Sequence, residues 1–356
     1  RCRREGPGMK VMVAMSGGVD SSVAAALLAR DGHEVVGVTM RLWGGESDTG
    51  CCSVSDVDDA RRVAQQLDID HLVFNFTDDF DAAVVQPYVD AHAAGVTPNP
   101  CIECNRRVKF ARLAERAELL GFDAVATGHH ANVVQRDGRW SLERGADRAK
   151  DQSYVVHMLG QAELARTLFP VGRFADKAEL RALASSLGLR TATKPDSQDV
   201  CFITSTGGRL DFLRRRLDLH PADVVDTDGA RVGEVAAVEL VTVGQRRGLG
   251  LPGGGPKRFV LAVDRATSTV VVGPESALLD PSVVIDDVTW IDGAVDGDVL
   301  VQCSAHGASR PATLEPLADG RARVRWHGAE RRVAAGQSMV FYDGSDRLVL
   351  GGGIAT

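Results

Sequence analysis

Ser16-Gly17-Gly18-Val19-Asp20-Ser21-Ser22 is the stretch of sequence that decides the fold. It follows the short apolar run Val11–Met15 and precedes Val23–Ala29, whose composition and spacing are helical. The stretch therefore predicts a strand, a glycine turn and the start of a helix. The two glycines let the backbone approach a phosphate closely, and the N–H groups of a helix N-terminus favour an anion. The serine hydroxyls add hydrogen-bond donors, and Asp20 could hold a metal ion.

These seven residues resemble the PP-loop, S-G-G-x-D-S-S, of the ATP pyrophosphatases. Those enzymes cleave ATP between its α- and β-phosphates and adenylylate a substrate. The chain contains no G-x-x-x-x-G-K-[ST] motif, so the γ-phosphate machinery of kinases and GTPases is missing from the sequence. The alternative interpretation is that a glycine-rich turn of this kind is only a tight connection. The match of every pattern position, in the right strand–helix context, favours the PP-loop.

Composition and length place limits on the class of protein. The 356 residues predict two or three domains, and the 44% apolar and 25% charged content is that of a soluble globular protein. No apolar run approaches the ~20 residues of a membrane span. An odd number of cysteines, seven, argues against a secreted disulfide framework, and residues 1–8 lack the apolar core of a signal peptide. We therefore expect a cytoplasmic protein with reduced thiols that starts at Met9, after a disordered extension over 1–8.

Short β-rich runs alternate with helical segments from Met9 to about residue 206. The expected strands are Val11–Met15, Glu34–Thr39, His71–Asn75 and Ala124–Thr127. The expected helices are Ser21–Arg30, Asp56–Leu67, Asp78–Ala94, Asn105–Leu120, Ser153–Thr167 and Lys177–Leu187. This alternation predicts βαβ units, a parallel sheet covered on both faces, and a ligand site at the carboxyl ends of the strands.

The composition changes after Leu217, where Val, Thr and Gly dominate and turn signals such as Asp292-Gly293 recur. This composition predicts two small β-rich modules with a boundary between residues 273 and 281. The expected fold is α/β. A parallel-sheet PP-loop domain, similar to the adenine nucleotide α-hydrolases, spans 9–209, a central β-rich domain spans 210–277, and a β-barrel-like domain spans 278–356.

A second chemical site is expected in Thr97-Pro-Asn-Pro-Cys-Ile-Glu-Cys-Asn-Arg-Arg-Val-Lys109. The two prolines predict an extended loop, and the helix is expected to begin at about Asn105. Cys104 then lies at a helix N-terminus among basic residues, an environment that lowers the pKa of a thiol. The neighbouring basic residues are Arg106, Arg107 and Lys109.

The cysteines allow three interpretations. They could be inert core residues, since the thiol is among the most buried side chains. Cys101 and Cys104, together with Cys201 or with Cys51-Cys52, could bind zinc or an iron–sulfur cluster. In the third interpretation one cysteine is a nucleophile and another carries a persulfide that can exchange into a disulfide. The residues alone do not separate metal binding from sulfur transfer.

Further motifs occur in order with the PP-loop, and together they resemble the bacterial tRNA-specific 2-thiouridylase family from Met9 to the C-terminus. The motifs are N-P-x-x-x-C-N, A-T-G-H, K-D-Q-S-Y, Q-D-V-C-F-I, G-Q-R-R-G-L-G and G-Q-S-M-V-F-Y. The resemblance implies ATP-dependent conversion of the wobble uridine of certain tRNAs to 2-thiouridine. It implies ATP and Mg²⁺ as cofactors, tRNA as a partner, a cysteine desulfurase or sulfur-relay protein as the sulfur donor, and no membrane.

The same resemblance implies roles for individual residues. Cys104 is the nucleophile, Cys201 carries the persulfide, and a disulfide that forms and opens during the reaction could join them. The residues implied at the ATP site are Ala14, Met15, Ser16, Gly17, Gly18, Val19, Asp20, Ser21, Met40 and Gly128. The residues implied in tRNA binding are Asn99, Pro100, Cys101, His129, Lys150, Asp151, Gln152 and Gln337.

Three positions depart from the family pattern or lack a role within it. Cys101 stands where other members of the family carry Asp, which enlarges the possible ligand set to Cys101, Cys104 and Cys201. Gln302-Cys303 stands where the family tends to show an Arg-Tyr pair near tRNA, and this puts that contact in doubt. Cys51-Cys52 falls in an expected loop, where a structural role is favoured.

Other functions stay open at this point. One is tRNA thiolation that depends on an iron–sulfur cluster bound by Cys101, Cys104 and Cys201, although no fourth ligand is evident. Another is a PP-loop amidase or ligase acting on a small molecule, which would not need the thiols. A third is a non-catalytic tRNA- or nucleotide-binding module. The net charge of −7 argues against a broad nucleic-acid surface, but basic clusters after residue 205, such as Arg246-Arg247, allow a local one.

Overall fold

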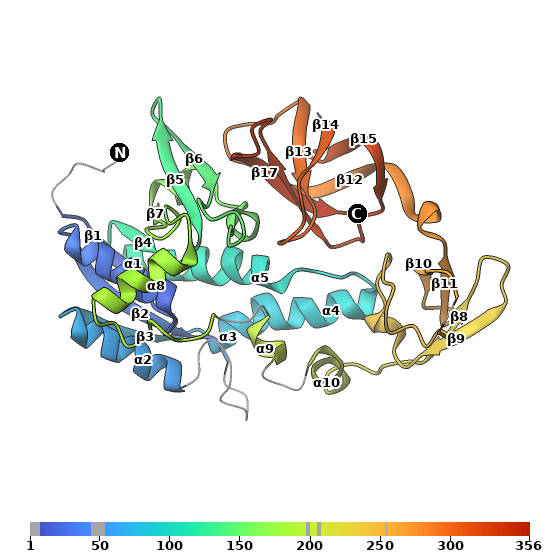
Figure 1. The fold of residues 1–356 in the computed structure, drawn as a ribbon, viewed down its shortest axis with the longest axis horizontal. Coiled ribbons are helices and arrows are strands. Elements are labelled where there is room, and N and C mark those ends of the chain that lie inside the picture. The colour runs from blue at the N-terminus through green and yellow to red at the C-terminus, as the bar shows by residue number, and fades with distance from the viewer. Residues whose placement is uncertain (1–7, 44–53, 197–199, 205–207, 254) are drawn as a thin grey trace.

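The computed structural model describes residues 8–43, 54–196, 200–204, 208–253 and 255–356, and three β-sheets organise them (Figure 1). The first is a parallel sheet with the strand order β3-β2-β1-β4-β7. Its strands are β1 (Lys10–Ala14), β2 (Glu34–Arg41), β3 (Asp70–Asn75), β4 (Ala124–Ala126) and β7 (Thr167–Leu168). The four expected strands are confirmed. Of the expected extension, only Gly8 lies within the described residues.

Helices cover both faces of this sheet, as the continuous apolar character of its inner strands requires. Val11 and Val13 of β1 pack with three helices, whereas Met12 packs with the helices of the opposite face. The helices of the first face are α1 (Val19–Arg30), α2 (Val54–Gln66) and α8 (Lys177–Ser186). Those of the second are α3 (Thr77–Phe80), η1 (Asp81–Val85), α4 (Gln86–Ala94), η2 (Cys104–Arg112) and α6 (Leu113–Leu119). The short helix α5 (Pro100–Glu103) continues into η2, and its Ile102 packs in a separate core cluster.

Two of the expected helical segments differ in the structure. The helix expected at Asn105 begins at Pro100, because the Asn99 side chain accepts a hydrogen bond from the backbone N–H of Cys101 and proline fits the first helical position. The helix expected over Ser153–Thr167 is broken at Gly160, which has an extended backbone. It forms the short elements η3 (Ser153–Val156) and α7 (Gln161–Ala165), and its last residue starts strand β7.

The second half of the chain forms the two β-rich modules that its composition predicts. The central sheet has the order β10-β11-β8-β9, and the last sheet closes into a six-stranded barrel through the pairing of β12 with β17. The central elements are β8 (Ala222–Val225), β9 (Arg231–Val235), η4 (Val238–Leu240), β10 (Phe259–Asp264), β11 (Thr269–Gly273) and η5 (Glu275–Leu278). The barrel strands are β12 (Leu279–Trp290), β13 (Gly297–Gln302), β14 (Arg310–Pro316), β15 (Ala322–Arg331), β16 (Ser338–Tyr342) and β17 (Leu348–Ala355). Two short helices, α9 (Cys201–Thr204) and α10 (Arg209–Arg214), precede the central sheet.

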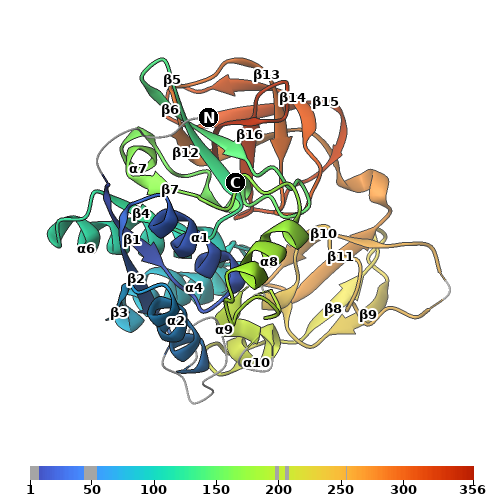
Figure 2. The ribbon, with the colours of Figure 1, turned by 60° about the vertical axis from the view of Figure 1, so that its left-hand side comes forward.

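One hairpin of the first domain belongs to the sheet of the barrel. Strands β5 (Ala131–Arg136) and β6 (Arg139–Arg144) pair with each other, and Leu142 and Glu143 of β6 continue onto β17. Figures 1 and 2 show this hairpin beside the barrel, above the parallel sheet. Among the described residues, no helix is both long enough and apolar enough to cross a bilayer.

Candidate active site

The PP-loop residues lie in the turn between β1 and α1, at the carboxyl end of the parallel sheet. Gly17 has φ +73°, and a Cβ there would lie 2.4 Å from the carbonyl oxygen of Asp56 in α2, so only glycine fits. The side-chain hydroxyls of Ser21 and Ser22 both donate to the carbonyl of Gly18, at 3.1 and 2.8 Å. These contacts fix the conformation of the turn at the start of α1. Gly18 is the N-cap residue of α1, and no side chain caps the helix there.

The other residues expected at ATP come from the strands on either side of β1. Met40 lies near the end of β2, and Gly128 follows β4. A Cβ at Gly128 would lie 2.7 Å from the backbone nitrogen of Ser21, so this glycine allows the loop after β4 to pack against the start of α1. Since the strand order reverses at β1, the expected ATP residues converge at a switch point of an open α/β sheet, where such folds bind ligands.

Asp20 is the charged centre of the PP-loop. Lys177, at the start of α8, places its ammonium 2.5 and 2.6 Å from the two carboxylate oxygens, and His130 Nε2 lies 3.0 Å from one of them. Burial opposes ionisation, but the hydrogen bonds from His130 and Lys177 outweigh it and lower the pKa of Asp20. The sequence did not point to Lys177, because no spacing rule connects it to the PP-loop.

The expected activation of Cys104 at a helix N-terminus is wrong. The helix starts at Pro100, so Cys104 lies inside it, with 8% of its surface exposed in the core of the second face. Burial raises the pKa of the Cys104 thiol to about 12. The neighbouring Arg106 and Arg107 are paired with Glu103, and Arg106 also with Asp287 of the barrel. The charge of Lys109 lowers the pKa of the thiol, but burial outweighs it.

The three thiols of the expected sulfur site nevertheless gather in one place. Cys101 and Cys201 are near enough to Cys104 to raise its pKa further, and Cys201 packs against the core cluster that contains Cys104. Ala14 and Met40, expected at ATP, belong to that same cluster. Cys101, Cys104 and Cys201 are thiols rather than disulfides. Within the described part of the chain, no three His, Cys, Asp or Glu side chains are arranged to hold a metal ion.

The buried state of Cys104 leads to a labelling prediction. Iodoacetamide should alkylate Cys104 about tenfold or more slowly than half-buried Cys101 and Cys201 at pH 8, because alkylation needs an accessible thiolate. Peptide mass spectrometry over time would measure the three rates, and the same labelling in denaturant should make them similar. Faster labelling of Cys104 in the folded protein would mean that its thiol is not buried in solution.

Several residues expected at tRNA are held by contacts within the protein. The Asp151 carboxylate accepts hydrogen bonds from Arg144 at 2.7 Å and from the Gly145 N–H at 2.8 Å. Gln152 accepts from the backbone of His130, and Gln337 donates to the carbonyl of Thr97. These contacts order the loops but leave the tRNA roles as predictions.

His129 and Lys150 differ in environment. His129 is buried between aromatic rings, and burial holds its pKa well below the usual range. Lys150 is exposed and pairs with Asp196 at 2.9 Å. Only Lys150 of these two presents a charge at the surface.

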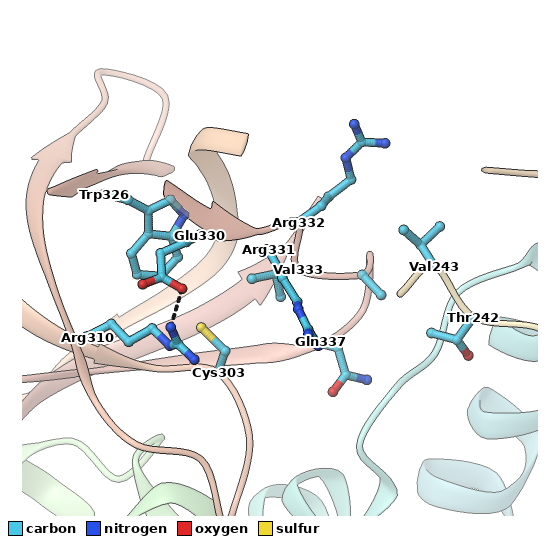
Figure 3. A pocket seen from close by; sticks show the side chains of 11 residues that line it. Thr242, Val243, Cys303, Arg310, Trp326, Glu330, Arg331, Arg332, Val333 and Gln337 are labelled. Atoms are coloured by element: carbon cyan, nitrogen blue, oxygen red, sulfur yellow. Dashed lines mark hydrogen bonds and ion pairs between the residues drawn. The ribbon is translucent and has the colours of Figure 1, made fainter. Parts of the chain in front are cut away.

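Cys303 lies outside this site, in a cavity of about 300 Å³ between the central sheet and the barrel (Figure 3). Thr242 and Val243 face it from the central side, and Trp326 and Arg310 face it from the barrel. Burial raises the pKa of Cys303 to about 12. Gln302 is buried, and its amide donates to the Ser304 carbonyl at 2.8 Å. The remaining pair, Cys51-Cys52, falls outside the described residues.

The chain is 46% identical over 353 residues to a tRNA-specific 2-thiouridylase MnmA of Chloroflexus aurantiacus, an alignment that covers 96% of this chain and 97% of that protein. The chain belongs to the tRNA-specific 2-thiouridylase family. Proteins of the same name from Roseiflexus castenholzii and Clostridium perfringens are 44% and 43% identical, each over 97% of this chain and 98% of the other.

Three family models match successive parts of this 2-thiouridylase chain. A model described as a tRNA methyl transferase HUP domain matches residues 9–205. A tRNA methyl transferase PRC-barrel domain matches 210–274, and an aminomethyltransferase beta-barrel domain matches 281–355. Among solved structures, a 4-thiouridine synthetase–RNA complex with bound ATP is 23% identical with a TM-score of 0.38, over 56% of this chain and 46% of that one. That likeness is too weak to carry an argument.

Proposed function

We propose that this protein is a tRNA-uridine 2-sulfurtransferase that converts the wobble uridine of tRNA to 2-thiouridine at the expense of ATP. The observation that carries the proposal is that residues expected at the ATP site and the thiols expected to deliver sulfur pack in one core cluster. Ala14 and Met40 of the ATP site pack in the same cluster as Cys104, with Cys201 against it. The chain is 44–46% identical to 2-thiouridylases over nearly its full length, and this similarity supports tRNA as the substrate.

The first half-reaction activates the uracil. Its 2-oxygen attacks the α-phosphorus of ATP, pyrophosphate leaves, and the oxygen becomes part of a good leaving group. The PP-loop backbone and Lys177 supply the donors and positive charge that the phosphates need. Mg²⁺ enters as MgATP, a form in which the nucleotide phosphates provide most of its ligands.

The second half-reaction delivers sulfur. A cysteine desulfurase or a relay protein transfers sulfane sulfur to Cys201, giving a persulfide. In one route the outer sulfur of the persulfide attacks C2, and the Cys104 thiolate then attacks Sγ of Cys201, which breaks the S–S bond and leaves the outer sulfur on C2. In the other route the Cys104 thiolate attacks Sγ of Cys201 first and releases sulfide, which adds to C2. In either route AMP leaves with the former 2-oxygen. Two thiols are oxidised to a disulfide while the sulfane sulfur is reduced, and a thiol reductant then restores the enzyme.

Cys104 must become a thiolate for this step, and its burial opposes that change. We therefore propose that tRNA binding at the helix beginning at Pro100 rearranges the surroundings of Cys104 before sulfur transfer. Asn99, Pro100 and Cys101, at the start of that helix, are the residues that would meet the target base.

The proposal is tested by the products. Purified protein, ATP, unmodified tRNA, a cysteine desulfurase with L-cysteine as the source of sulfane sulfur, and a thiol reductant should yield AMP, pyrophosphate and 2-thiouridine at the wobble position, measured by nucleoside mass spectrometry. Formation of ADP and phosphate would contradict the PP-loop chemistry. ATP cleavage that does not depend on tRNA but requires a small amine or acid would favour the amidase or ligase alternative.

The exposed pair Arg246-Arg247 of the central domain gives a test of tRNA binding. Changing both to glutamine should weaken tRNA binding and reduce its salt dependence by up to about 0.7–0.9 in slope for each phosphate that these arginines neutralise. Filter binding over a series of salt concentrations measures the slope. Arg331 and Arg332, which pair with Glu275 and Asp280, provide the matched control and should change the slope less. An unchanged slope in the Arg246-Arg247 variant would mean that these arginines are solvated and do not contact the phosphates of tRNA.

A further inference from the structure

Asp196 lies a few residues before Cys201 in the chain and is surrounded by basic side chains. Its carboxylate accepts hydrogen bonds from Lys150 at 2.9 Å and from Arg181 at 2.8 Å. The ammonium of Lys177 lies 3.3 Å from it. Burial works against the charged form, but the hydrogen bond from Lys150 and the charge of Lys177 outweigh it and lower the pKa of Asp196 to about 2. Asp196 is therefore a carboxylate at neutral pH.

Lys177 connects Asp196 to the ATP site. The same ammonium that lies 3.3 Å from Asp196 is hydrogen-bonded to both oxygens of Asp20 in the PP-loop. The side chain of Lys177 is only 13% exposed, so its charge is screened less than that of a surface lysine. One lysine thus bridges the residue that precedes Cys201 and the loop that binds ATP.

A second contact fixes the same segment from the other side. Lys194 donates to Asp56 at 2.6 Å and to Asp59 at 2.7 Å, and both acids belong to α2. The backbone carbonyl of Asp56 is also the group that packs closely against Gly17 of the PP-loop. Lys194 and Asp196 therefore connect the described segment that ends at residue 196, five positions before Cys201, to α2 and to the PP-loop.

From these contacts we propose that Asp196 is a positioning residue that couples the ATP site to the sulfur carried by Cys201. The inference rests on the proposed function. Phosphates bound at the PP-loop compete with Asp20 for Lys177. Because Lys177 also pairs with Asp196, a movement of its ammonium changes the ion pair with Asp196. When the coupling is intact, sulfur from Cys201 attacks C2 of the adenylylated uridine before water does. When it is lost, water attacks the adenylylated uridine instead and returns uridine and AMP, so that ATP is consumed without product.

The test is the ratio of pyrophosphate released to 2-thiouridine formed, measured in the same reaction with tRNA, ATP, a cysteine desulfurase with L-cysteine as the source of sulfane sulfur, and a thiol reductant. The native protein should give a ratio near one. Asp196→Asn should raise it by about fivefold, the size of effect expected from removing one partly exposed ion-pair centre. Asp196→Glu keeps the charge and should restore most of the coupling. Asp211→Asn removes an exposed acid that follows Cys201 and should leave the ratio unchanged.

The outcomes are distinct from those that test the overall function. If the native protein releases no pyrophosphate with tRNA, the proposed function fails and the ratio is undefined. If Asp196→Asn slows pyrophosphate release and thiolation equally, Asp196 serves only the ATP site and the coupling proposal is overturned. Melting temperatures of the variants within a few degrees of the native value would show that the folded enzyme is being compared.

Discussion

Asp20→Ala is expected to abolish the formation of AMP and pyrophosphate, reducing the rate by about a hundredfold or more. The carboxylate holds Lys177 and His130 in place at the PP-loop, and without it both groups lack their common partner. The fold should persist, because Lys177 keeps Asp196 nearby and the turn itself is held by the hydrogen bonds of Ser21 and Ser22. The measurement is tRNA-dependent pyrophosphate release, with circular dichroism as the check on folding.

A control for this experiment lies on the same helix. Asp31 is exposed at the opposite end of α1, and Asp31→Ala should leave pyrophosphate release at the native level. An Asp20→Ala protein that folds and still releases pyrophosphate at a native rate would contradict the assignment of the PP-loop as the ATP site.

Cys104→Ser and Cys201→Ser should each eliminate 2-thiouridine while preserving adenylylation of tRNA. Activation of the uracil uses the PP-loop, whereas sulfur delivery needs a thiol that can carry or displace sulfur, and a hydroxyl does neither. Pyrophosphate release and nucleoside mass spectrometry, measured together, separate the two half-reactions. Cys303→Ser, a change in the barrel cavity, is the matched control and should retain thiolation.

The thiol at position 101 distinguishes sulfur transfer from a cluster mechanism. Under direct sulfur transfer, Cys101→Asp should be nearly silent, because Cys104 and Cys201 carry the chemistry. If Cys101→Asp abolishes thiolation, or if protein purified without oxygen is brown and contains iron, the three cysteines act as cluster ligands and the persulfide mechanism is wrong.

The PP-loop could be predicted from sequence because a strand, a glycine turn and a helix start depend only on neighbouring residues. The partners of Asp20 could not, since Lys177 comes from a helix that is distant in the sequence and no local pattern connects it to the PP-loop. The start of the thiol helix differs from the expectation because a pair of nearby prolines favours an extended loop, whereas Pro100 occupies the first helical position. Asn99 before it is a strong N-cap, and it is the signal in the sequence that marks the true boundary.

The β5–β6 hairpin is absent from the expected elements although its turn has a recognisable sequence. Asp137 and Gly138 have φ of +50° and +79°, the conformation that Asp-Gly adopts in two-residue hairpin turns. The flanking runs alternate weakly, and nothing local says that β6 continues onto a strand more than two hundred residues later, where Leu142 meets Val349. Long-range pairing of this kind depends on the assembled fold.

That pairing also limits how the protein can be divided. The hairpin is encoded with the catalytic half, yet its strand partner is β17, and the core of Leu142, Tyr154, Val340 and Tyr342 takes side chains from both halves. A fragment ending before the central sheet would carry β6 with an unpaired edge and half of an apolar core open to water, a combination that invites aggregation. The modules visible in the sequence are therefore not expected to fold independently, because the barrel covers part of the apolar core of the first domain.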